Sequence, residues 1–305
     1  MNERALRREE ETRAELVELI SSLVQSDGIL EPIPGLRLTR ACHPTDHVHA
    51  VTKPCFCVIA QGAKEIYLGE SVYRYDPYRY LLATIEVPVT GQIVEASIPR
   101  PYLALRLELD PLQVGSAMVE AGLPTPTGHA EAKAVVVSKL DAGLLDTSVR
   151  LLRLLQSPSE SRVIMPLVKR ELVLRLLMGE QGNRLRHLPL QGGYSDYIAK
   201  AVDRLRNEFD RPLRIEALAK DLGMSSSGFH HHFKAITDMS PLQFQKQIRL
   251  QEARRLMIGQ NLDAASAGLR VGYDDASHFS RDYKRLFGNS PARDAERLRS
   301  MVAAD

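Results

Sequence analysis

Apolar side chains recur with a helical period in residues 263–291, whose sequence is DAASAGLRVGYDDASHFSRDYKRLFGNSP. The pattern predicts a short helix that ends at Gly272, a turn, and a second helix that begins near Ala276 or Ser277 and ends before Gly288 and Pro291. At about 100° per residue, the second helix divides into two faces: Phe279, Tyr283, Leu286 and Phe287 lie on one, and Ser277, His278, Arg281 and Arg285 lie on the other. An apolar packing face opposite a face rich in hydrogen-bond donors is what a helix-turn-helix recognition helix presents to the major groove.

A similar pattern occurs upstream, in IEALAKDLGMSSSGFHHHFK, residues 215–234. Gly223 predicts the turn and Ser225 the N-cap of the second helix, in which Phe229 and Phe233 point inward. Between the two units, PLQFQKQIRLQEARRLM (residues 241–257) predicts a connecting helix about 25 Å long at ~1.5 Å per residue. Two recognition helices joined in this way could enter successive major grooves about 34 Å apart, so that one chain could bind a bipartite site.

The N-terminal half has a different pattern, because residues 36–109 consist of short β-branched and aromatic segments separated by turn residues. Residues 64–76 predict a hairpin around Gly69 and Glu70, and the spacing of the segments is typical of a small barrel or sandwich. Helices are predicted at residues 111–121, at about 141–156 and at about 161–179. The chain begins with an amphipathic helix whose inward positions are Leu16, Leu19, Ile20, Leu23 and Val24.

Composition and charge narrow the class of protein. The 305 residues are 44% hydrophobic and 26% charged with a net charge of +2, as in an ordinary globular protein of two domains. The net charge is weak evidence for nucleic-acid binding, so the placement of the basic residues carries that argument. Neither a membrane span nor a signal-peptide core is present, and three cysteines do not make a disulfide framework. We therefore expect a cytoplasmic protein without a membrane partner.

The two helical units and their connecting helix, together about 100 residues, resemble the DNA-binding domain of the AraC/XylS family of bacterial transcription regulators. The N-terminal half resembles the AraC-type regulator N-terminal domain in IPGLRLTR (33–40), residues 55–69, YDPYRYLLATIEVPVTGQ (75–92) and PYLALRLELDP (101–111). The resemblance implies an α+β protein: a cupin-like β-barrel with flanking helices, followed by an all-α tandem helix-turn-helix domain. It predicts a sensor and dimerisation domain in residues 1–185 (barrel about 28–115, helices about 141–180), a linker at 186–195 and a DNA-binding domain at 196–300.

The same resemblance implies a function. It predicts a regulator, not an enzyme, that binds double-stranded DNA and is controlled by a small effector whose chemistry the sequence leaves open. RNA polymerase and a second copy of the chain, in a homodimer, are the further partners that it suggests. No cofactor is predicted.

The predicted DNA-binding residues are Ser227, His230, His231 and Lys234 in the first unit and Ser277, His278, Arg281 and Arg285 in the second. By resemblance, the serine and the two histidines of the first unit fall where family members approach bases. Arg281 is predicted to bind a guanine edge, and Arg285 with Lys284 to bind phosphates. The alternatives are a solvated face or a metal cluster for the histidines, and a surface salt bridge with Asp282 or Asp274 for Arg281.

Two further features concern the helices around these residues. Arg249, Arg254 and Arg255 of the connecting helix are candidate phosphate contacts, with a solvated helix face as the alternative. Gly268, inside the short helix of the second unit, costs about 1 kcal/mol relative to alanine. A close approach by the neighbouring helix would explain that glycine.

In the N-terminal half, two pairs of residues are candidates for chemistry. Cys55 and Cys57 are predicted on one face of a strand, either as effector-binding or redox-active thiols or as small buried hydrophobic residues. His47 and His49 form a His-x-His pair, which leaves a metal-dependent cupin enzyme with a DNA-binding appendage as the alternative function. Because no third ligand at cupin spacing is evident, we predict no metal site and no catalytic residue.

Overall fold

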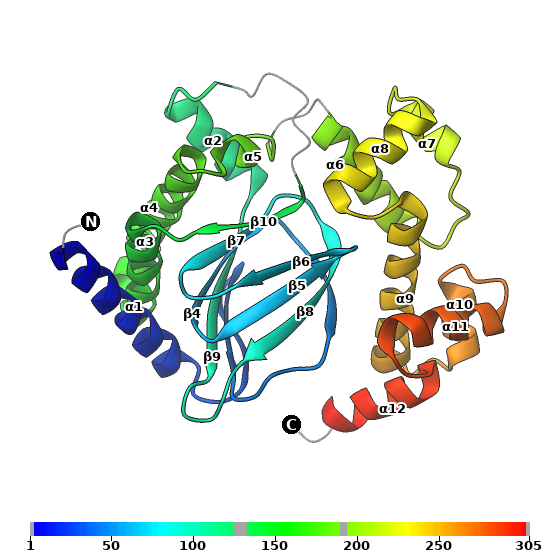
Figure 1. Ribbon diagram of the computed structural model, residues 1–305, viewed down its shortest axis with the longest axis horizontal. Helices are drawn as coiled ribbons and strands as arrows, with labels where there is room; N and C mark the ends of the chain where they lie inside the picture. Colours follow the sequence, from blue (N-terminus) through cyan, green and yellow to red (C-terminus); the bar gives the residue numbers. More distant parts are fainter. Residues whose placement is uncertain (1–2, 125–132, 190–193, 303–305) are drawn as a thin grey trace. The chain divides into compact units, whose positions relative to one another are not determined.

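The computed structural model describes residues 3–124, 133–189 and 194–302 (Figure 1). The chain divides into two compact units, Met1–Asp196 and Tyr197–Asp305. The first contains strands and helices, and the second is helical in its described residues. The predicted α+β class is confirmed.

The first unit contains two antiparallel sheets. Across the six-stranded sheet the order is β1 (Gly28–Ile33), β2 (Leu36–Ala41), β9 (Tyr102–Glu108), β4 (Cys55–Gln61), β7 (Arg79–Ala83) and β10 (Val135–Lys139). Across the four-stranded sheet it is β3 (Val48–Thr52), β8 (Val87–Glu95), β5 (Ala63–Leu68) and β6 (Ser71–Tyr75). The predicted hairpin is confirmed, because β5 pairs with β6 from Lys64 opposite Tyr75 to Leu68 opposite Ser71.

The strand region differs from the predicted barrel in two respects. Its strands pair in two separate sheets within the described residues, so hydrogen bonding does not close them into one barrel. The larger sheet also extends beyond residue 115, because β10 pairs with β7 along Val135–Lys139. In the sequence this strand lies between two helical segments. Its partner β7 lies more than 50 residues earlier in the chain, so the pairing depends on the tertiary fold.

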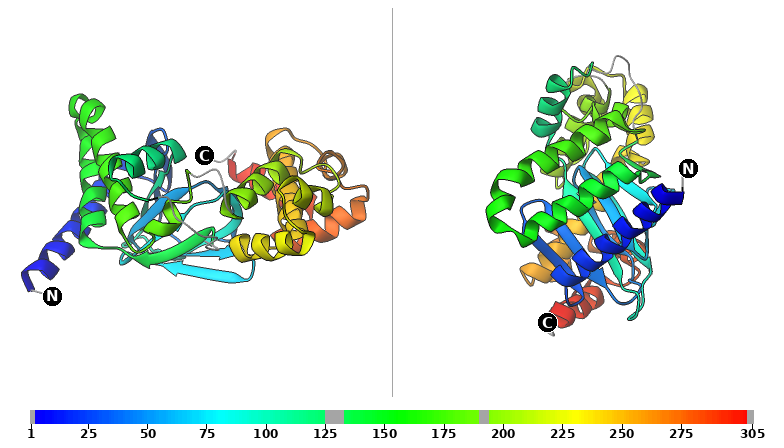
Figure 2. Two further views of the ribbon diagram at one scale, coloured as in Figure 1. Left: turned by 90° about the horizontal axis from the view of Figure 1, so that it is seen from above. Right: turned by 90° about the vertical axis from the view of Figure 1, so that its left-hand side faces the viewer.

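Helices cover one face of the six-stranded sheet. They are α1 (Glu3–Leu23), α3 (Ala142–Arg153) and α4 (Pro158–Met178), which lie side by side across the strands in the right-hand view of Figure 2. Shorter elements complete this layer: α2 (Pro111–Glu120), η1 (Leu154–Gln156) and α5 (Gly182–Leu185). A salt bridge between Arg153 and Glu15 joins α3 to α1, with Nε 2.5 Å from Oε1.

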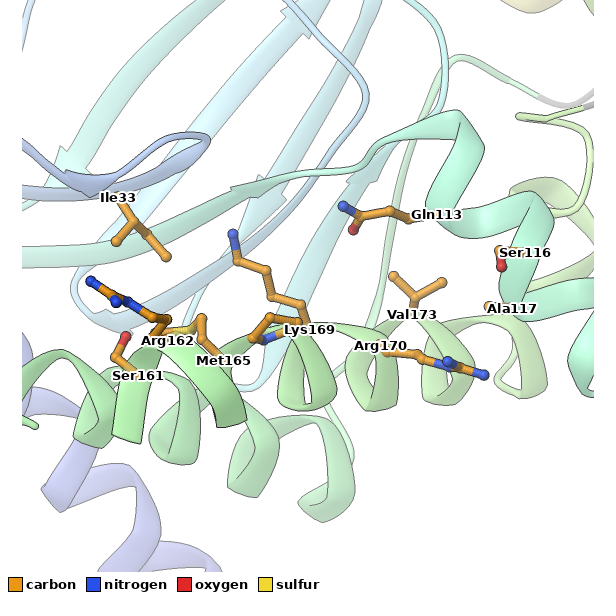
Figure 3. Close-up of a pocket in the computed structure, with 11 residues that line it drawn as sticks. Ile33, Gln113, Ser116, Ala117, Ser161, Arg162, Met165, Lys169, Arg170 and Val173 are labelled. Carbon is orange, nitrogen blue, oxygen red and sulfur yellow. The ribbon is translucent and has the colours of Figure 1, made fainter. Parts of the chain in front are cut away.

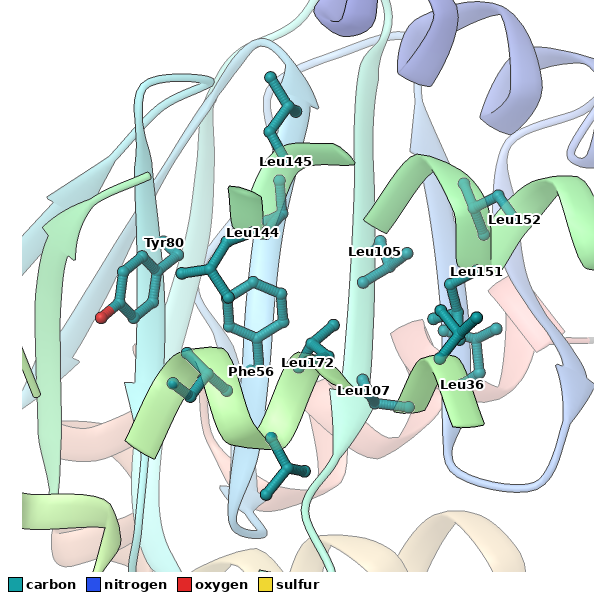
Figure 4. Packing of buried hydrophobic residues seen from close by; sticks show 14 of the residues in the cluster. Leu36, Phe56, Tyr80, Leu105, Leu107, Leu144, Leu145, Leu151, Leu152 and Leu172 are labelled. Carbon is teal, nitrogen blue, oxygen red and sulfur yellow. The ribbon is translucent and has the colours of Figure 1, made fainter. Parts of the chain in front are cut away.

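The main hydrophobic core lies between this helical layer and the sheet (Figure 4). Phe56, Leu105 and Leu36 of the strands meet Leu144 and Leu172 of the helices, and all five side chains are buried. Each buried side chain of this kind contributes roughly 1.5–3 kcal/mol relative to leaving it exposed. The predicted inward face of the first helix is also confirmed, since four of its five positions are buried and the fifth packs against the core: Leu16, Leu19, Ile20, Val24 and, partly buried, Leu23.

Strand β4 has both of its faces covered. Phe56 and Val58 belong to the core under the helices, so the alternating Cys55 and Cys57 point to the other side of the sheet. Every residue from Cys55 to Ala60 is buried. The uninterrupted apolar sequence of this strand follows from burial on both faces.

The second unit is built from α6 (Tyr194–Asn207), α7 (Ile215–Asp221), α8 (Ser226–Thr237), α9 (Pro241–Gly259), α10 (Ala264–Arg270), α11 (Ala276–Phe287) and α12 (Pro291–Val302). Residues 190–193 of the predicted linker lie outside the described residues, and the predicted domain boundaries stay predictions. Among the described helices of the whole chain, none combines the length and apolar character that a membrane span requires.

Candidate nucleic-acid interface

The first helix-turn-helix unit consists of α7 and α8. The Ser225 side chain accepts a hydrogen bond from the backbone N–H of Gly228, which confirms the predicted N-cap. Phe229 and Phe233 are fully buried, and the ring of Phe233 contacts that of Phe244 at a centroid distance of 5.4 Å. Because Phe244 belongs to α9, this edge-to-face contact attaches the recognition helix of the first unit to the connecting helix.

The opposite face of α8 is exposed. It carries the four residues predicted to bind DNA: Ser227, His230, His231 and Lys234. His232 is only partly exposed and lies beside His231, with ring centroids 5.4 Å apart. The structure therefore brings the four predicted side chains together on one face of one helix.

The second unit consists of α10 and α11, which approach each other closely. A Cβ added to Gly268 would lie 2.9 Å from Cγ of Phe279, closer than real Cβ atoms come. The close approach that would explain this glycine is confirmed. Gly272, in the turn, has a φ of +87°, and a Cβ there would lie 2.1 Å from the carbonyl oxygen of Asp210. Packing therefore requires glycine at position 268, whereas at position 272 both the packing and the left-handed φ require it.

Helix α11 has the two faces that its sequence predicts. Phe279 and Tyr283 are buried and in ring contact at 5.6 Å, whereas Leu286 and Phe287 are partly buried. Asp275 caps the N-terminus by accepting from the backbone N–H of His278. The four residues predicted to bind DNA are all exposed: Ser277, His278, Arg281 and Arg285.

A buried carboxylate organises the basic residues around α11. Asp282 lies 2.9 Å from Nζ of Lys246 of α9 and 3.5 Å from Nε2 of His278, and it also pairs with Arg285. Arg281 forms no salt bridge with a described residue, so neither Asp282 nor Asp274 neutralises it there. From the sequence, Asp282 was predicted only as an alternative partner of Arg281; its i,i+3 and i,i+4 spacing to Arg285 and His278 was the signal for the observed contacts.

Two arginines of α9 have roles that contradict their prediction as phosphate contacts. Arg249 donates hydrogen bonds to three backbone carbonyl oxygens. Its Nε lies 2.6 Å from the oxygen of Phe209, its Nη1 lies 2.8 Å from that of Gly272, and its Nη2 lies 2.9 Å from that of Arg211. The donors of this side chain are therefore used within the protein, and Arg249 is neither a phosphate contact nor part of a solvated helix face. It connects the loop after α6 to the turn of the second unit.

Arg254 forms an internal salt bridge. Its Nε lies 2.8 Å from Oδ2 of Asp294, a fully buried residue of α12 that also accepts from the hydroxyl of Tyr283 at 2.9 Å. The guanidinium of Arg254 also stacks on the ring of Phe287. Of the three arginines, only Arg255 is exposed, and it pairs with Glu252 of the same helix.

In the first unit the structure places Cys55 and Cys57 together in a charged interior. Their Sγ atoms are 3.7 Å apart, and Arg106 lies opposite Cys57 on the neighbouring strand β9. The hydrogen bond from Cys57 lowers the pKa of Cys55 to about 6, against the effect of burial and with help from the charge of Arg106. The same hydrogen bond, together with burial, raises the pKa of Cys57 well above its ordinary value. Sequence reasoning missed the contribution of Arg106, because cross-strand register decides it.

His47 and His49 contact other residues than these thiols. The ring of His47 makes an edge contact with Tyr67, and Nδ1 of His49 lies 2.9 Å from Oγ1 of Thr90. Within the described residues no group of three His, Cys, Asp or Glu side chains is arranged to hold a metal ion.

Comparison with known proteins decides the family. Residues 32–184, half of the chain, match the AraC-type transcriptional regulator N-terminus, and residues 218–297 match a helix-turn-helix domain. The chain belongs to the AraC-type transcriptional regulators. The resemblance stated from the sequence is therefore confirmed, and the second match covers both recognition helices.

Curated relatives of this AraC-type chain are bacterial regulators. It is 26% identical over 135 residues to the HTH-type transcriptional regulator ArgR of Pseudomonas aeruginosa, a match that covers 43% of this chain and 40% of ArgR. It is 27% identical over 212 residues to a probable thc operon regulatory protein of Rhodococcus erythropolis, covering 64% of this chain and 61% of that protein. The matched segments thus span less than two thirds of the length of these relatives.

A solved structure shares the fold. Apo ToxT of Vibrio cholerae superimposes with a TM-score of 0.53 at 10% sequence identity, over 87% of this chain and 98% of ToxT. At this identity the likeness concerns the fold alone.

The buried salt bridge of α9 yields a stability prediction. Arg254→Met leaves the carboxylate of Asp294 buried without its main partner, so we expect the opening free energy of α11 to fall by about 3–5 kcal/mol. Arg255→Met, on the same helix, removes an exposed pair and should cost less than about 1 kcal/mol. Hydrogen exchange of α11 in the full chain measures both. Equal protection in the two variants would contradict the structural role of Arg254.

Proposed function

We propose that this AraC-type chain is a sequence-specific regulator of bacterial transcription that binds double-stranded DNA in the cytoplasm and responds to a small effector in its first unit. The observation that carries the proposal is the pair of helices α8 and α11, each of which buries an aromatic face and exposes a face of Ser, His, Lys and Arg side chains. No catalytic step is part of the proposal. Recruitment of RNA polymerase would use exposed residues outside these two faces.

The connecting helix supports a bipartite site. Helix α9 has 19 residues, two more than the sequence pattern indicated, and so spans about 28 Å at ~1.5 Å per residue. Both recognition helices pack on α9, and its length suits successive major grooves about 34 Å apart. A single chain would then contact two half-sites on one side of the duplex.

The exposed residues would divide into base and phosphate contacts. Arg281, which forms no salt bridge with a described residue, is available for a bidentate pair with guanine, and Ser277 and His278 would contact neighbouring bases. Ser227, His230 and His231 would do the same in the other half-site. Lys234 and Arg285 would bind phosphates, with Arg285 positioned by its pair with Asp282.

Arg281→Ala tests base recognition. Loss of the guanine contact should relax selectivity at one base pair by roughly 1–3 kcal/mol. Lys234→Ala should instead weaken binding to all sequences and reduce the slope of log affinity against log salt by about 0.9. Enrichment of genomic fragments by the purified protein at two salt concentrations measures both effects.

The control is Lys139→Ala, which removes an exposed lysine of the first unit and should bind as wild type does. A short bipartite motif recovered by wild type and altered by Arg281→Ala or His231→Ala would support the proposal. Salt-sensitive binding without any motif, identical in all variants, would refute the assignment of the two recognition helices.

We also propose Cys55 and Cys57 as the effector-responsive residues of the first unit. A thiolate at Cys55 is favoured by the neighbouring thiol and by Arg106, one of whose Nη atoms is buried without a hydrogen-bond partner among the described residues. Residues two apart on a strand have Cα atoms about 6.6 Å apart, near the upper limit for a disulfide. Addition of an electrophile to the thiolate therefore fits this pair better than disulfide formation does.

The thiol hypothesis has a pH signature. Because the pKa of Cys55 is lowered to about 6, its thiolate should be present at neutral pH and be lost as the pH falls through about 6. In the Cys42→Ser background, N-ethylmaleimide should therefore modify Cys55 at neutral pH and change DNA affinity, with the rate falling in acid. Mass spectrometry and DNA binding follow the reaction.

Cys42 provides the matched thiol, since its hydrogen bond with Asp27 raises its pKa. A Cys55→Ser/Cys57→Ser variant that retains Cys42 should no longer respond. If it responds to the reagent as wild type does, the two buried cysteines are only small hydrophobic residues.

For the homodimer we propose helix α4 as the contact. Val163 and Leu167, one helical turn apart, are 66% and 59% exposed, and apolar side chains of this exposure on one helix face are typical of an interface. Leu167→Glu should convert a dimer to monomers in sedimentation velocity, because it places a charge in an apolar contact. Leu242→Glu, at a similarly exposed leucine of the second unit, is the control. An unchanged dimer in Leu167→Glu would exclude this face.

A further inference from the structure

A cavity of about 550 Å³ lies in the first unit between α2, α4 and the end of β1. Its apolar lining includes Ile33, Met165 and Val173, and its polar lining includes Gln113, Arg162 and Lys169 (Figure 3). Cys55 and Cys57 do not line it. Its volume lies within the roughly 300–1,000 Å³ that is usual for small-molecule sites.

The basic side chains that line the cavity differ in whether they form a salt bridge within the protein. Arg170 forms a salt bridge with Glu120 of α2. Arg162 and Lys169 form none with the described residues. Burial lowers the pKa of Lys169, and no carboxylate acts against that effect. An ammonium group that is partly withdrawn from water without a counterion favours an anion from outside the chain.

The side chains are arranged so that one ligand could contact all three elements. In Figure 3, Lys169 extends from α4 into the space between Ile33 and Gln113, and the amide of Gln113 points back towards it. Arg162 lies about two helical turns before Lys169 on the same helix, beneath Ile33. Met165 and Val173 are buried and form part of the apolar lining.

We propose that this cavity binds a small amphipathic anion. The anionic head would accept hydrogen bonds from Lys169, Arg162 and Gln113, and the apolar body would lie on Met165, Val173 and Ile33. Such a ligand bridges α2, α4 and the end of β1, so the stability of the first unit should rise with the logarithm of ligand concentration above the dissociation constant. The site is separate from the thiol pair and from the DNA-binding residues.

Calorimetric titration of the full chain with 4-phenylbutanoate tests the proposal, with 4-phenylbutan-1-ol as the neutral ligand of the same apolar body. One site per chain is expected for the anion. Lys169→Met keeps an apolar side chain of similar length but removes the charge, so the affinity for the anion should fall roughly tenfold or more. The affinity for the alcohol should be weak and should not change.

Two further variants make the result specific to the cavity. Gln113→Trp places a large ring in the cavity from an exposed position, and it should abolish binding of the anion while the circular dichroism of the chain is retained. Lys139→Met, at an exposed lysine outside the cavity, should bind the anion as wild type does.

The proposal is overturned if wild type does not bind 4-phenylbutanoate, if Lys169→Met binds it unchanged, or if Gln113→Trp retains the site. Loss of binding in Cys55→Ser alone would also overturn it, because the ligand would then lie between the sheets. None of these readouts uses DNA, so a failure of the DNA-binding proposal cannot produce them.

Discussion

The carboxylate of Asp294 joins three helices of the second unit. It accepts from Arg254 of α9 and from the hydroxyl of Tyr283 of α11, while its own backbone belongs to α12. Burial acts to raise the pKa of Asp294, but the hydrogen bonds and charge of Arg254 outweigh it, so the pKa lies below its usual range. The group therefore stays ionised, and an ionised group inside a protein must keep its partners. This requirement fixes the second recognition helix on the connecting helix.

The same connecting helix holds the first recognition helix by different means. There, Phe233 and Phe244 meet through apolar rings, and a capping box of Ser240 and Gln243 begins α9 directly after the first unit. Arg249 then attaches the turn of the second unit to the loop after α6. Because both units are anchored to one helix, the separation of their exposed faces is set by its length. A bipartite DNA site is the functional consequence that we propose.

The first unit has candidate ligand sites on the two sides of its larger sheet. Between the sheets, Cys55 and Cys57 lie with Arg106 and the half-buried Lys64, whose pKa is lowered by desolvation. On the side of the helices, the cavity between α2 and α4 contains Lys169 above an apolar lining. Successive side chains of strand β4 point to opposite faces of the sheet, so Phe56 faces the helical core and Cys55 faces away from it. The two proposed sites therefore lie on opposite faces of one sheet.

Local pattern in the sequence was sufficient for the two recognition helices, the N-cap of the first and the two faces of each. Periodicity alone decides that Phe279 is opposite Arg281, and Ser225 caps its helix through the backbone N–H of Gly228, only three residues away. Contacts between residues far apart in the sequence could not be predicted from local pattern. The strand β10, the pairing of Arg254 with Asp294, the place of Arg106 beside Cys57 and the cavity around Lys169 all depend on register and packing between segments far apart in the chain. Only the tertiary structure showed that Arg249 and Arg254 form contacts within the protein, although both had been candidates for phosphate binding. The reason is that the charge of a side chain does not determine its partner.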